Sequence, residues 1–414
     1  MKSFKNNAEK DTQNRIIWLC LFIYSIAYFG RYSFSSSINS LIDNYHVSKA
    51  ETGLVMTFFF VAYGIGQVIN GIFCRHYPSR YIFPIALTGS AAINLFMFAF
   101  IKTGYIADHF YLVKYIWLLN GISQSLLWTS IIFVLGKNIE KNNLAKAGLA
   151  IGMAVPGGTF LAYSVSSLMA HFKIFEFSFA LAAVMMLVAA LTWLLLFSPH
   201  ERQDLDENLP DGKDKSGGRN KMSRLAVLTF AGLAVFAVSN NFIKDGLHTF
   251  IPTILKEQFD FSNSASLILA TVVYVIGVLS AIVVKRINEK IKNLISLAIV
   301  FFLATATFIG LITAFLKISF IPVVLLFTLV MLSSYGVNNI VTGIGPLYLR
   351  DEINPGTAAG MLDGFCYVGS ALSTYTLGSI ADHFGWTAVI LTILTIVLLA
   401  IAAAGTLRAI ARHK

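Results

Sequence analysis

Long apolar segments recur about every 30 to 40 residues along the whole chain, and each is long enough to cross a lipid bilayer. Inside lipid the backbone has to satisfy its own hydrogen bonds, which only helices and closed barrels achieve. Barrel strands show short segments of alternating polarity, and these runs do not alternate. Charged residues make up 13% of the chain, about half the share found in a soluble domain. The runs therefore predict membrane-spanning α-helices.

We predict twelve such helices, in an all-α integral membrane protein made of two pseudo-symmetric six-helix halves. The first six cover residues 16–42, 53–74, 81–101, 111–136, 146–170 and 174–197. The second six cover residues 225–254, 263–285, 292–315, 319–347, 356–381 and 386–408. The polar stretch between them carries both signs of charge and is typical of a solvated linker. The predicted units are an N-terminal half at 1–197, a linker at 198–224 and a C-terminal half at 225–414.

The Lys and Arg residues lie mainly on one side of this predicted topology. Loops that stay in the cytoplasm retain positive charge, and an N-terminus on the inside assigns each loop to one side of the membrane. The inside segments hold 23 of the 31 and the outside loops hold six. Both termini and the linker are therefore predicted to face the cytoplasm, in the inner membrane of a bacterial cell. The net charge of +10 follows from this topology and does not call for a nucleic-acid partner.

The two predicted halves resemble each other in sequence. Arg31 in the first half corresponds to Lys244 in the second, and Ser48 corresponds to Ser262. The pair Ile65-Gly66 likewise corresponds to Ile276-Gly277, so the three offsets are 213, 214 and 211, and a common register holds over roughly 35 residues. Repeated halves with a binding site at their interface are the architecture of many secondary transporters.

Arg31 lies in the middle of the first predicted span, 16 residues after Arg15 and 12 before Asp43. At 1.5 Å per residue, about 18 Å or more of helix separates it from either flank, which is farther than its side chain reaches. A cation within a span costs about 2.5 to 3.5 kcal/mol to insert. A partner carboxylate, a wet cavity or an anionic ligand has to offset this cost. We expect Arg31 to face a substrate, and a structural ion pair is the alternative.

Lys244 lies at the matching depth of the seventh predicted span, with Asn240 and His248 on the same helix face. Asp245 follows directly and points about 100° away around the helix, so it is not expected to be the automatic partner of Lys244. Two cations at pseudo-symmetric positions are predicted to meet across a central cleft and to repel each other there. A divalent anion such as phosphate or a dicarboxylate would relieve that repulsion.

Asp363 is a carboxylate in the eleventh predicted span, with Tyr367 and Ser370 on its helix face. Three roles stay open for it: an ion pair with Lys244, a bond to a substrate hydroxyl, or the transport of a proton. Asp245 is the second proton-coupling candidate. Other polar and aromatic residues within spans are candidates for the same cleft, although helix packing is the alternative for each. They are Tyr28, Asn120, Gln124, Trp128, Tyr335, Asn338 and Asn339.

Several segments resemble one family of membrane carriers. The run YFGRYSF, from Tyr28 to Phe34, looks like the first-helix arginine motif of the organophosphate:phosphate antiporters of the major facilitator superfamily. The run from Lys244 to Glu257 resembles the seventh-helix segment of that family. The stretches 356–360 and 384–386 resemble the sequence around its eleventh helix. The likeness therefore covers both halves of the chain.

The resemblance implies a carrier that exchanges an organic phosphate, of the sugar phosphate or glycerol phosphate type, for inorganic phosphate by alternating access. In that family a pair of arginines on helices one and seven binds the phosphate. Arg31 matches the first. Lys244 stands in the place of the second and keeps the charge without the two-pronged donor geometry of arginine. The predicted substrate site comprises Arg31, Lys244, Tyr28, His248, Gln124, Tyr335, Asn339, Asp363 and Tyr367.

Two other functions stay open on the sequence. A proton-coupled symporter of an organic carboxylate, such as a sugar acid, would use Asp363 or Asp245 as its proton carrier. A non-transporting membrane sensor of the same kind of anion is the second alternative. We expect no enzymatic activity, cofactor or metal site, because the sequence shows no nucleophile–base pair, metal-ligand cluster or phosphate-cradling glycine loop. We expect a monomer in a lipid bilayer, with a small anionic substrate as its partner.

Overall fold

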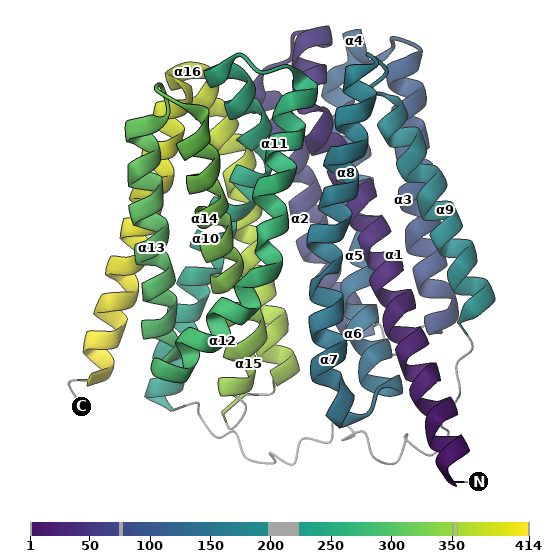
Figure 1. The fold of residues 1–414 in the computed structure, drawn as a ribbon, viewed down its shortest axis with the longest axis vertical. Helices are drawn as coiled ribbons and strands as arrows, with labels where there is room; N and C mark the ends of the chain where they lie inside the picture. Colours follow the sequence, from purple (N-terminus) through teal and green to yellow (C-terminus); the bar gives the residue numbers. More distant parts are fainter. Residues whose placement is uncertain (1, 74–77, 198–222, 350–351, 354, 413–414) are drawn as a thin grey trace.

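The computed structural model describes residues 2–73, 78–197, 223–349, 352–353 and 355–412. In these ranges the regular structure is helical, and the long helices stand side by side along the longest axis of the molecule (Figure 1). Most of the predicted linker lies outside the described residues. Its last two positions are described: Ser223 caps the helix that begins at Arg224 by accepting a hydrogen bond from the Ala226 amide at 3.2 Å.

The described residues before the predicted linker form ten helical segments. They are α1 (Lys2–Tyr45), α2 (Lys49–Phe73), α3 (Ser79–Lys102), α4 (Ile106–His109), η2 (Phe110–Leu112), α5 (Val113–Ser125), α6 (Leu127–Asn138), α7 (Lys141–Gly152), α8 (Ala154–His171) and α9 (Phe177–Leu196). In Figure 1 these segments occupy one side of the molecule, with α3 and α9 at its edge. The contacts between α1 and α8, and between α3 and α9, hold this side together.

The other side of the molecule is formed by the segments after Ser223 (Figure 1). They are α10 (Arg224–Phe259), α11 (Asn263–Val275), η4 (Ile276–Leu279), α12 (Ser280–Lys290), α13 (Leu294–Phe315), α14 (Phe320–Asn338), the π-helix η5 (Asn339–Ile344), α15 (Gly345–Tyr348) and α16 (Pro355–Arg412). The most extensive packing within this side is between α10 and α16.

The described helices provide twelve membrane spans, as the sequence predicts. Eleven segments are long and apolar enough to cross a bilayer, and the last of them runs over 54 residues within α16. A straight helix of that length would be about 80 Å long, far more than the roughly 30 Å of a hydrocarbon core. Gly385 interrupts it with φ 76° and ψ 178°, a conformation that is essentially restricted to glycine. α16 is therefore two spans that turn back on each other at Gly385.

Four predicted spans are interrupted rather than continuous. The span at 111–136 is divided into α5 and α6 at Leu126, and the span at 146–170 is divided into α7 and α8 at Met153. The span at 263–285 contains the 3₁₀ turn η4, and the span at 319–347 contains the π-helix η5. The helix that contains the first predicted span is longer than that span: α1 starts at Lys2, and the segment long and apolar enough to cross a bilayer starts at Asp11.

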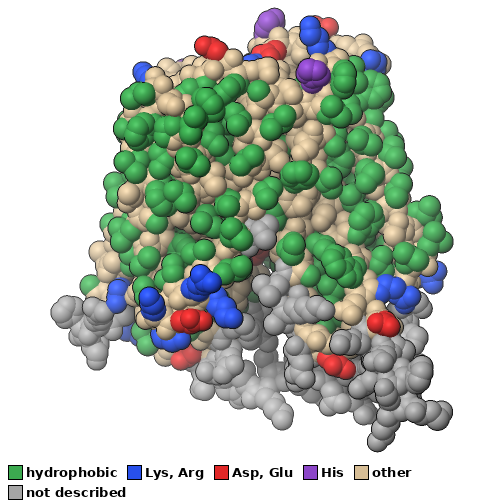
Figure 2. Space-filling model, in the orientation of Figure 1, with side chains coloured by type: hydrophobic (Ala, Val, Ile, Leu, Met, Phe, Trp, Pro, Cys, Tyr) green, Lys and Arg blue, Asp and Glu red, His purple; other side chains and the backbone are tan. Residues whose placement is uncertain are grey.

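The middle of the molecule presents an apolar surface. Figure 2 shows hydrophobic side chains over the waist of the visible face, with Lys, Arg, Asp and Glu gathered at its two ends. Large apolar side chains such as Leu195, Leu399 and Ile65 are more than half exposed. An apolar belt of this kind is unfavourable in water and matches the hydrocarbon layer of a membrane.

The two ends of the bundle differ in how the two sides meet. α1 begins and α16 ends at the same end, here called the terminal end (Figure 1). At the opposite far end the two sides are joined by polar contacts. Lys256 of α10 forms an ion pair with Asp43 of α1, Lys49 of α2 pairs with Glu257 at 3.1 Å, and the Ser167 hydroxyl donates to the Ser264 carbonyl at 2.9 Å. The far end is therefore closed.

Candidate anion-binding site

Arg31 is held in a fixed position inside the bundle. Its side chain, on α1, is 3% exposed, and its Nε donates a hydrogen bond to Gln124 Oε1 on α5 at 3.1 Å. The guanidinium carbon lies 4.2 Å from the centre of the Tyr63 ring and 4.4 Å from that of Tyr28. These rings attract the cation through their negative faces, so they offset part of the cost of its burial.

Part of the hydrogen-bonding capacity of Arg31 is unused. Within the described part of the chain, no carboxylate lies within ion-pairing distance of Arg31. Its Nη2 atom is buried and makes no hydrogen bond there, and the same is true of the neighbouring Tyr63 hydroxyl. A buried donor without a partner is costly. Two of them beside an uncompensated charge form a local environment suited to the oxygen atoms of an anion.

A hydrogen-bond network orients the Gln124 side chain. Gln124 Nε2 donates to the Ser90 hydroxyl on α3 at 3.0 Å, and the Ser90 hydroxyl in turn donates to Asn120 Oδ1. With its amide nitrogen engaged in this way, Gln124 can present only its carbonyl oxygen to Arg31. The network therefore sets the direction in which the remaining guanidinium donors point.

Lys244 has a carboxylate partner, contrary to the sequence-based expectation. Its Nζ lies 3.6 Å from Asp245 Oδ1, although the two residues are adjacent on α10. The expectation considered only the directions of the two Cβ atoms, whereas four flexible methylenes let the ammonium group bend around the helix. The Ser370 hydroxyl on α16 donates to the other oxygen of Asp245. The charge of Lys244 is thus already balanced within the protein.

Asp363 lies in the same electrostatic environment and has no close cation. The charges that act on it are those of Lys244, Arg31 and Asp245, yet it forms no ion pair within 4 Å among the described residues. Its side chain on α16 is half-buried rather than enclosed. The Tyr28 hydroxyl is within electrostatic range of both Arg31 and Lys244. The two cations therefore share one central region between the two sides of the molecule.

His248 lies one helical turn beyond Lys244 toward the far end. Its ring is stacked between Tyr32 of α1, with centroids 4.7 Å apart, and Tyr274 of α11, at 3.8 Å. Its Nε2 is 3.3 Å from the Tyr335 hydroxyl, and its backbone carbonyl accepts a hydrogen bond from Tyr163 at 2.8 Å. This aromatic cluster joins the two sides and closes the central region toward the far end.

The remaining predicted site residues have other contacts. Tyr367 packs against Tyr63, with ring centroids 4.8 Å apart, and so supports the aromatic wall around Arg31. Asn339 begins the π-helix η5 and donates to the Ser280 hydroxyl at 3.0 Å. This bond lies within the second half of the chain, and it uses one of the donors that the sequence-based hypothesis assigned to a substrate.

Tyr63 and the His248 cluster partners Tyr32, Tyr163 and Tyr274 were not predicted as site residues. In the sequence each is an aromatic residue in an apolar run, which is indistinguishable from ordinary core packing. Only the approach of α2 to Arg31 shows that Tyr63 carries a polar group beside the cation.

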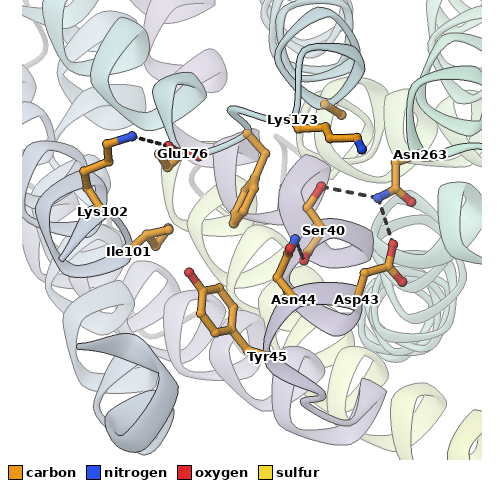
Figure 3. Close-up of a pocket in the computed structure, with 11 residues that line it drawn as sticks. Ser40, Asp43, Asn44, Tyr45, Ile101, Lys102, Lys173, Glu176 and Asn263 are labelled. Atoms are coloured by element: carbon orange, nitrogen blue, oxygen red, sulfur yellow. Dashed lines mark hydrogen bonds and ion pairs between the residues drawn. The ribbon is translucent and has the colours of Figure 1, made fainter. Parts of the chain in front are cut away.

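A hollow lies at the far end, between α1, α3, α8 and α11. It measures about 480 Å³ and is lined by Ser40, Asp43, Asn44, Tyr45, Ile101, Lys102, Ala170, Lys173, Phe175, Glu176 and Asn263. Figure 3 shows two polar pairs here: Lys102 forms an ion pair with Glu176 at 3.1 Å, and the Asn263 amide donates a hydrogen bond to Asp43 at 3.0 Å. Because these groups are paired locally, the central region around Arg31 is the better candidate for anion binding.

The fold and the sequence together decide the family. Residues 20–344 match the sequence pattern of the major facilitator superfamily, which is well over half of the chain. The chain belongs to the major facilitator superfamily. It is therefore a multi-pass membrane protein with a transporter fold and not an enzyme. Membership supports a lipid bilayer and a small molecule as its partners, and it leaves the identity of that molecule open.

Two curated relatives of this superfamily member are membrane sensor proteins. A segment of 108 residues is 29% identical to the membrane sensor protein UhpC of Escherichia coli strain K12. The equivalent identity to UhpC of Salmonella typhimurium is 26%. In both cases the match covers 26% of this chain and spans 22% of the length of the relative.

Solved structures of the superfamily share the fold over nearly the whole length. A bacterial homologue of the human lysosomal transporter Spinster, in an inward-facing and occupied conformation, superposes with a TM-score of 0.76 at 12% identity over 95% of this chain and 96% of that one. A D-xylose–proton symporter gives a TM-score of 0.66 at 13% identity, with 95% and 96% of the two chains covered. The nucleoside transporter NupG gives 0.67 at 17% identity, with 96% and 100% covered. Similarity at this level establishes the fold alone.

Proposed function

We propose that the protein transports a small organic anion across the membrane by alternating access, with Arg31 binding the anionic group. The observation that supports this most directly is the unused donor capacity of Arg31, which is buried, lacks a carboxylate partner in the described residues and leaves Nη2 without a hydrogen bond. An anion with two or three oxygens satisfies that charge and the Tyr63 hydroxyl together. A neutral solute satisfies the donors but leaves the charge uncompensated.

A phosphate ester of the sugar phosphate or glycerol phosphate type is the favoured cargo. The sequence around Arg31 resembles carriers of such compounds, and a guanidinium group fits phosphate oxygens in a two-pronged arrangement. Lys244 supplies a second cation in the same region, although Asp245 already pairs with it. Exchange for inorganic phosphate is the coupling that the resemblance implies, and proton-coupled uptake of an organic anion is the alternative.

A membrane sensor is the second candidate function. It is favoured by a specific observation, since the two curated relatives described above are named as membrane sensor proteins. A sensor and a transporter can use the same anion site, because both need a conformational change that binding drives. They differ in whether the ligand crosses the membrane.

The test is ligand stabilisation followed by counterflow. Purified protein is heated with inorganic phosphate, glycerol 3-phosphate, gluconate, or glycerol as the uncharged control. We expect one or more anions, and not glycerol, to raise the stability by about 2.7 kcal/mol at one hundred times the dissociation constant. Arg31→Gln should abolish the effect, whereas Arg15→Gln, at an exposed position, should preserve it.

The same anion is then tested for counterflow in proteoliposomes. Exchange of labelled for unlabelled anion supports a transporter, and binding without counterflow supports a sensor. Stabilisation by glycerol alone, or unchanged anion binding in Arg31→Gln, would contradict the proposed anion site.

A further inference from the structure

The helices α2 and α16 meet across the interface between the two sides of the molecule, and their packing there is extensive. Two glycines lie where the helices are closest. A Cβ atom on Gly53 of α2 would overlap the backbone carbonyl oxygen of Thr374 on α16. In the reverse direction, a Cβ atom on Gly378 of α16 would overlap the carbonyl oxygen of Lys49 on α2. Small residues let helix backbones approach this closely, so α2 and α16 touch backbone to backbone near the far end.

Asp382 of α16 caps α2 from the opposite side of the interface. The first amides of a helix have no partner within it. Ser48 and Glu51 satisfy part of this need locally, because the Glu51 amide donates to the Ser48 hydroxyl at 3.1 Å and the Ser48 amide donates to the Glu51 carboxylate at 2.9 Å. The amides of Lys49 and Ala50 instead donate to the two carboxylate oxygens of Asp382, at 3.1 and 2.7 Å. α2 therefore obtains part of its cap from the other half of the chain.

Further polar contacts strengthen this seam between α2 and the second half. The Lys49 ammonium lies 3.1 Å from Glu257 of α10 and 3.6 Å from Asp382. The Thr57 hydroxyl of α2 donates to the Ala371 carbonyl of α16 at 2.8 Å. Hydrogen bonds to a charged group contribute more to stability than those between neutral groups. The cap and the ion pairs formed by Asp382 are therefore the strongest polar contacts of the α2–α16 seam.

The pseudo-symmetric seam, between α8 and α11, is built differently. At an offset of 214, Gly53 corresponds to Leu267, and the α11 sequence from 263 to 275 contains no glycine. α8 and α11 are joined through side chains, since the Ser167 hydroxyl donates to the Ser264 carbonyl at 2.9 Å. The far-end hollow of about 480 Å³ borders these two helices. The far end is therefore closed tightly along α2–α16 and less tightly along α8–α11.

Other close glycine contacts join helices within one half. A Cβ atom on Gly121 of α5 would overlap the carbonyl oxygen of Phe59 on α2, and both helices belong to the first half. When two halves rock against each other, contacts within a half persist and contacts between the halves at the closing end break. Gly121 therefore supports every state of the cycle, whereas Gly53 and Gly378 support the state in which the far end is closed.

We propose that the α2–α16 seam is the lock that holds the far end closed, and that Gly53, Gly378 and Asp382 set the balance between closed and open states. This inference concerns the conformational cycle and does not depend on the identity of the cargo. A methyl group at either glycine has to push the two backbones apart, because a helix carbonyl cannot swing away as a side chain can. Alanine also favours the helix over glycine, so the substitution disfavours the closed state without unfolding either helix.

The experiment measures the separation of the two sides at the far end by double electron–electron resonance, in proteoliposomes and without ligand. Spin labels are attached at Asp108→Cys and Lys317→Cys, two exposed positions on opposite sides of the interface. The background carries Cys74→Ser and keeps the buried cysteines Cys20 and Cys366. We expect the wild type to give a short distance that corresponds to the closed far end, with a smaller population at a longer distance.

Three seam variants, Gly53→Ala, Gly378→Ala and Asp382→Ala, should each raise the ratio of the long-distance to the short-distance population at least fivefold. Asp382→Ala adds no volume, so it tests the lock even if a glycine variant does not fold. Gly121→Ala is the matched control: it should lower the melting temperature and leave the ratio within twofold of the wild type. Ser264→Ala, which alters the α8–α11 seam, should also leave the ratio within twofold.

Two results would overturn the inference. One is an unchanged ratio in every seam variant that folds. The other is a shift in Gly121→Ala or Ser264→Ala as large as that in Asp382→Ala, which would show that the closed state depends on general packing and not on the α2–α16 seam. Neither result bears on the proposed anion site, because the measurement contains no anion.

Discussion

Replacing Arg31 with lysine tests the geometry of the anion site, because the substitution keeps the charge and removes the fork of donors. In the structure Nε is used by Gln124 at 3.1 Å, and Nη2 has no partner. A lysine ammonium offers a single point of contact to an anion where the guanidinium offers two. One hydrogen bond to a charged group contributes about 1.5 to 3 kcal/mol. At about 1.4 kcal/mol for each factor of ten, Arg31→Lys should weaken anion binding by about 10- to 150-fold.

The assay is the anion concentration that half-saturates thermal stabilisation, measured for the wild type and three variants. Arg15→Lys is the control for an exchange of the same residue types at an exposed site. Lys244→Arg should change the affinity by less than Arg31→Lys, because Asp245 already neutralises Lys244. Binding by Arg31→Lys within threefold of the wild type would refute the assignment of Arg31 as the principal anion ligand.

Two further predictions concern the far end. Reversing either charge of the Asp43–Lys256 ion pair should lower the free energy of unfolding, and the double exchange Asp43→Lys with Lys256→Asp should restore it. A double-mutant cycle should yield a coupling energy of roughly 0.5 to 1 kcal/mol for a partly exposed pair. A coupling energy near zero would show that the contact is incidental. Lys317→Cys, in an exposed turn, should react with a membrane-impermeant thiol reagent in intact cells, and labelling only after the membrane is opened would reverse the predicted orientation.

Most of the fold could be predicted because lipid imposes a minimum helix length. Segment 292–315 was predicted almost to the residue, since α13 spans Leu294–Phe315, and the turn at Gly385 falls where the last two predicted spans are separated. The interruptions at Leu126 and in η5 could not be predicted. They preserve hydropathy and change only the hydrogen-bond spacing, which depends on how neighbouring helices pack.

The candidate site could be predicted from the sequence where a buried charge is costly. It could not be predicted where a contact depends on how a side chain bends or on how closely a neighbouring helix packs. Arg31 was found because a cation in mid-span requires an explanation. The partner of Lys244 was missed because adjacency on a helix gives the direction of Asp245 and not the reach of a lysine. Tyr63 was missed because its role depends on the approach of α2 to α1, which one helix alone does not reveal.

The interface between the two sides of the molecule carries one charge pattern in the central region and a different one at the far end, at positions related by the pseudo-symmetry. Arg31 and Lys244 are separated by 213 residues, and so are Asp43 and Lys256, which lie 12 residues farther along the same two helices. At the far end the related positions have opposite charges and attract without any ligand. In the central region they have like charges, and carboxylates or a bound anion must supply the attraction. In the proposed transport cycle, opening the far end breaks this ion pair whether or not an anion is bound at the centre.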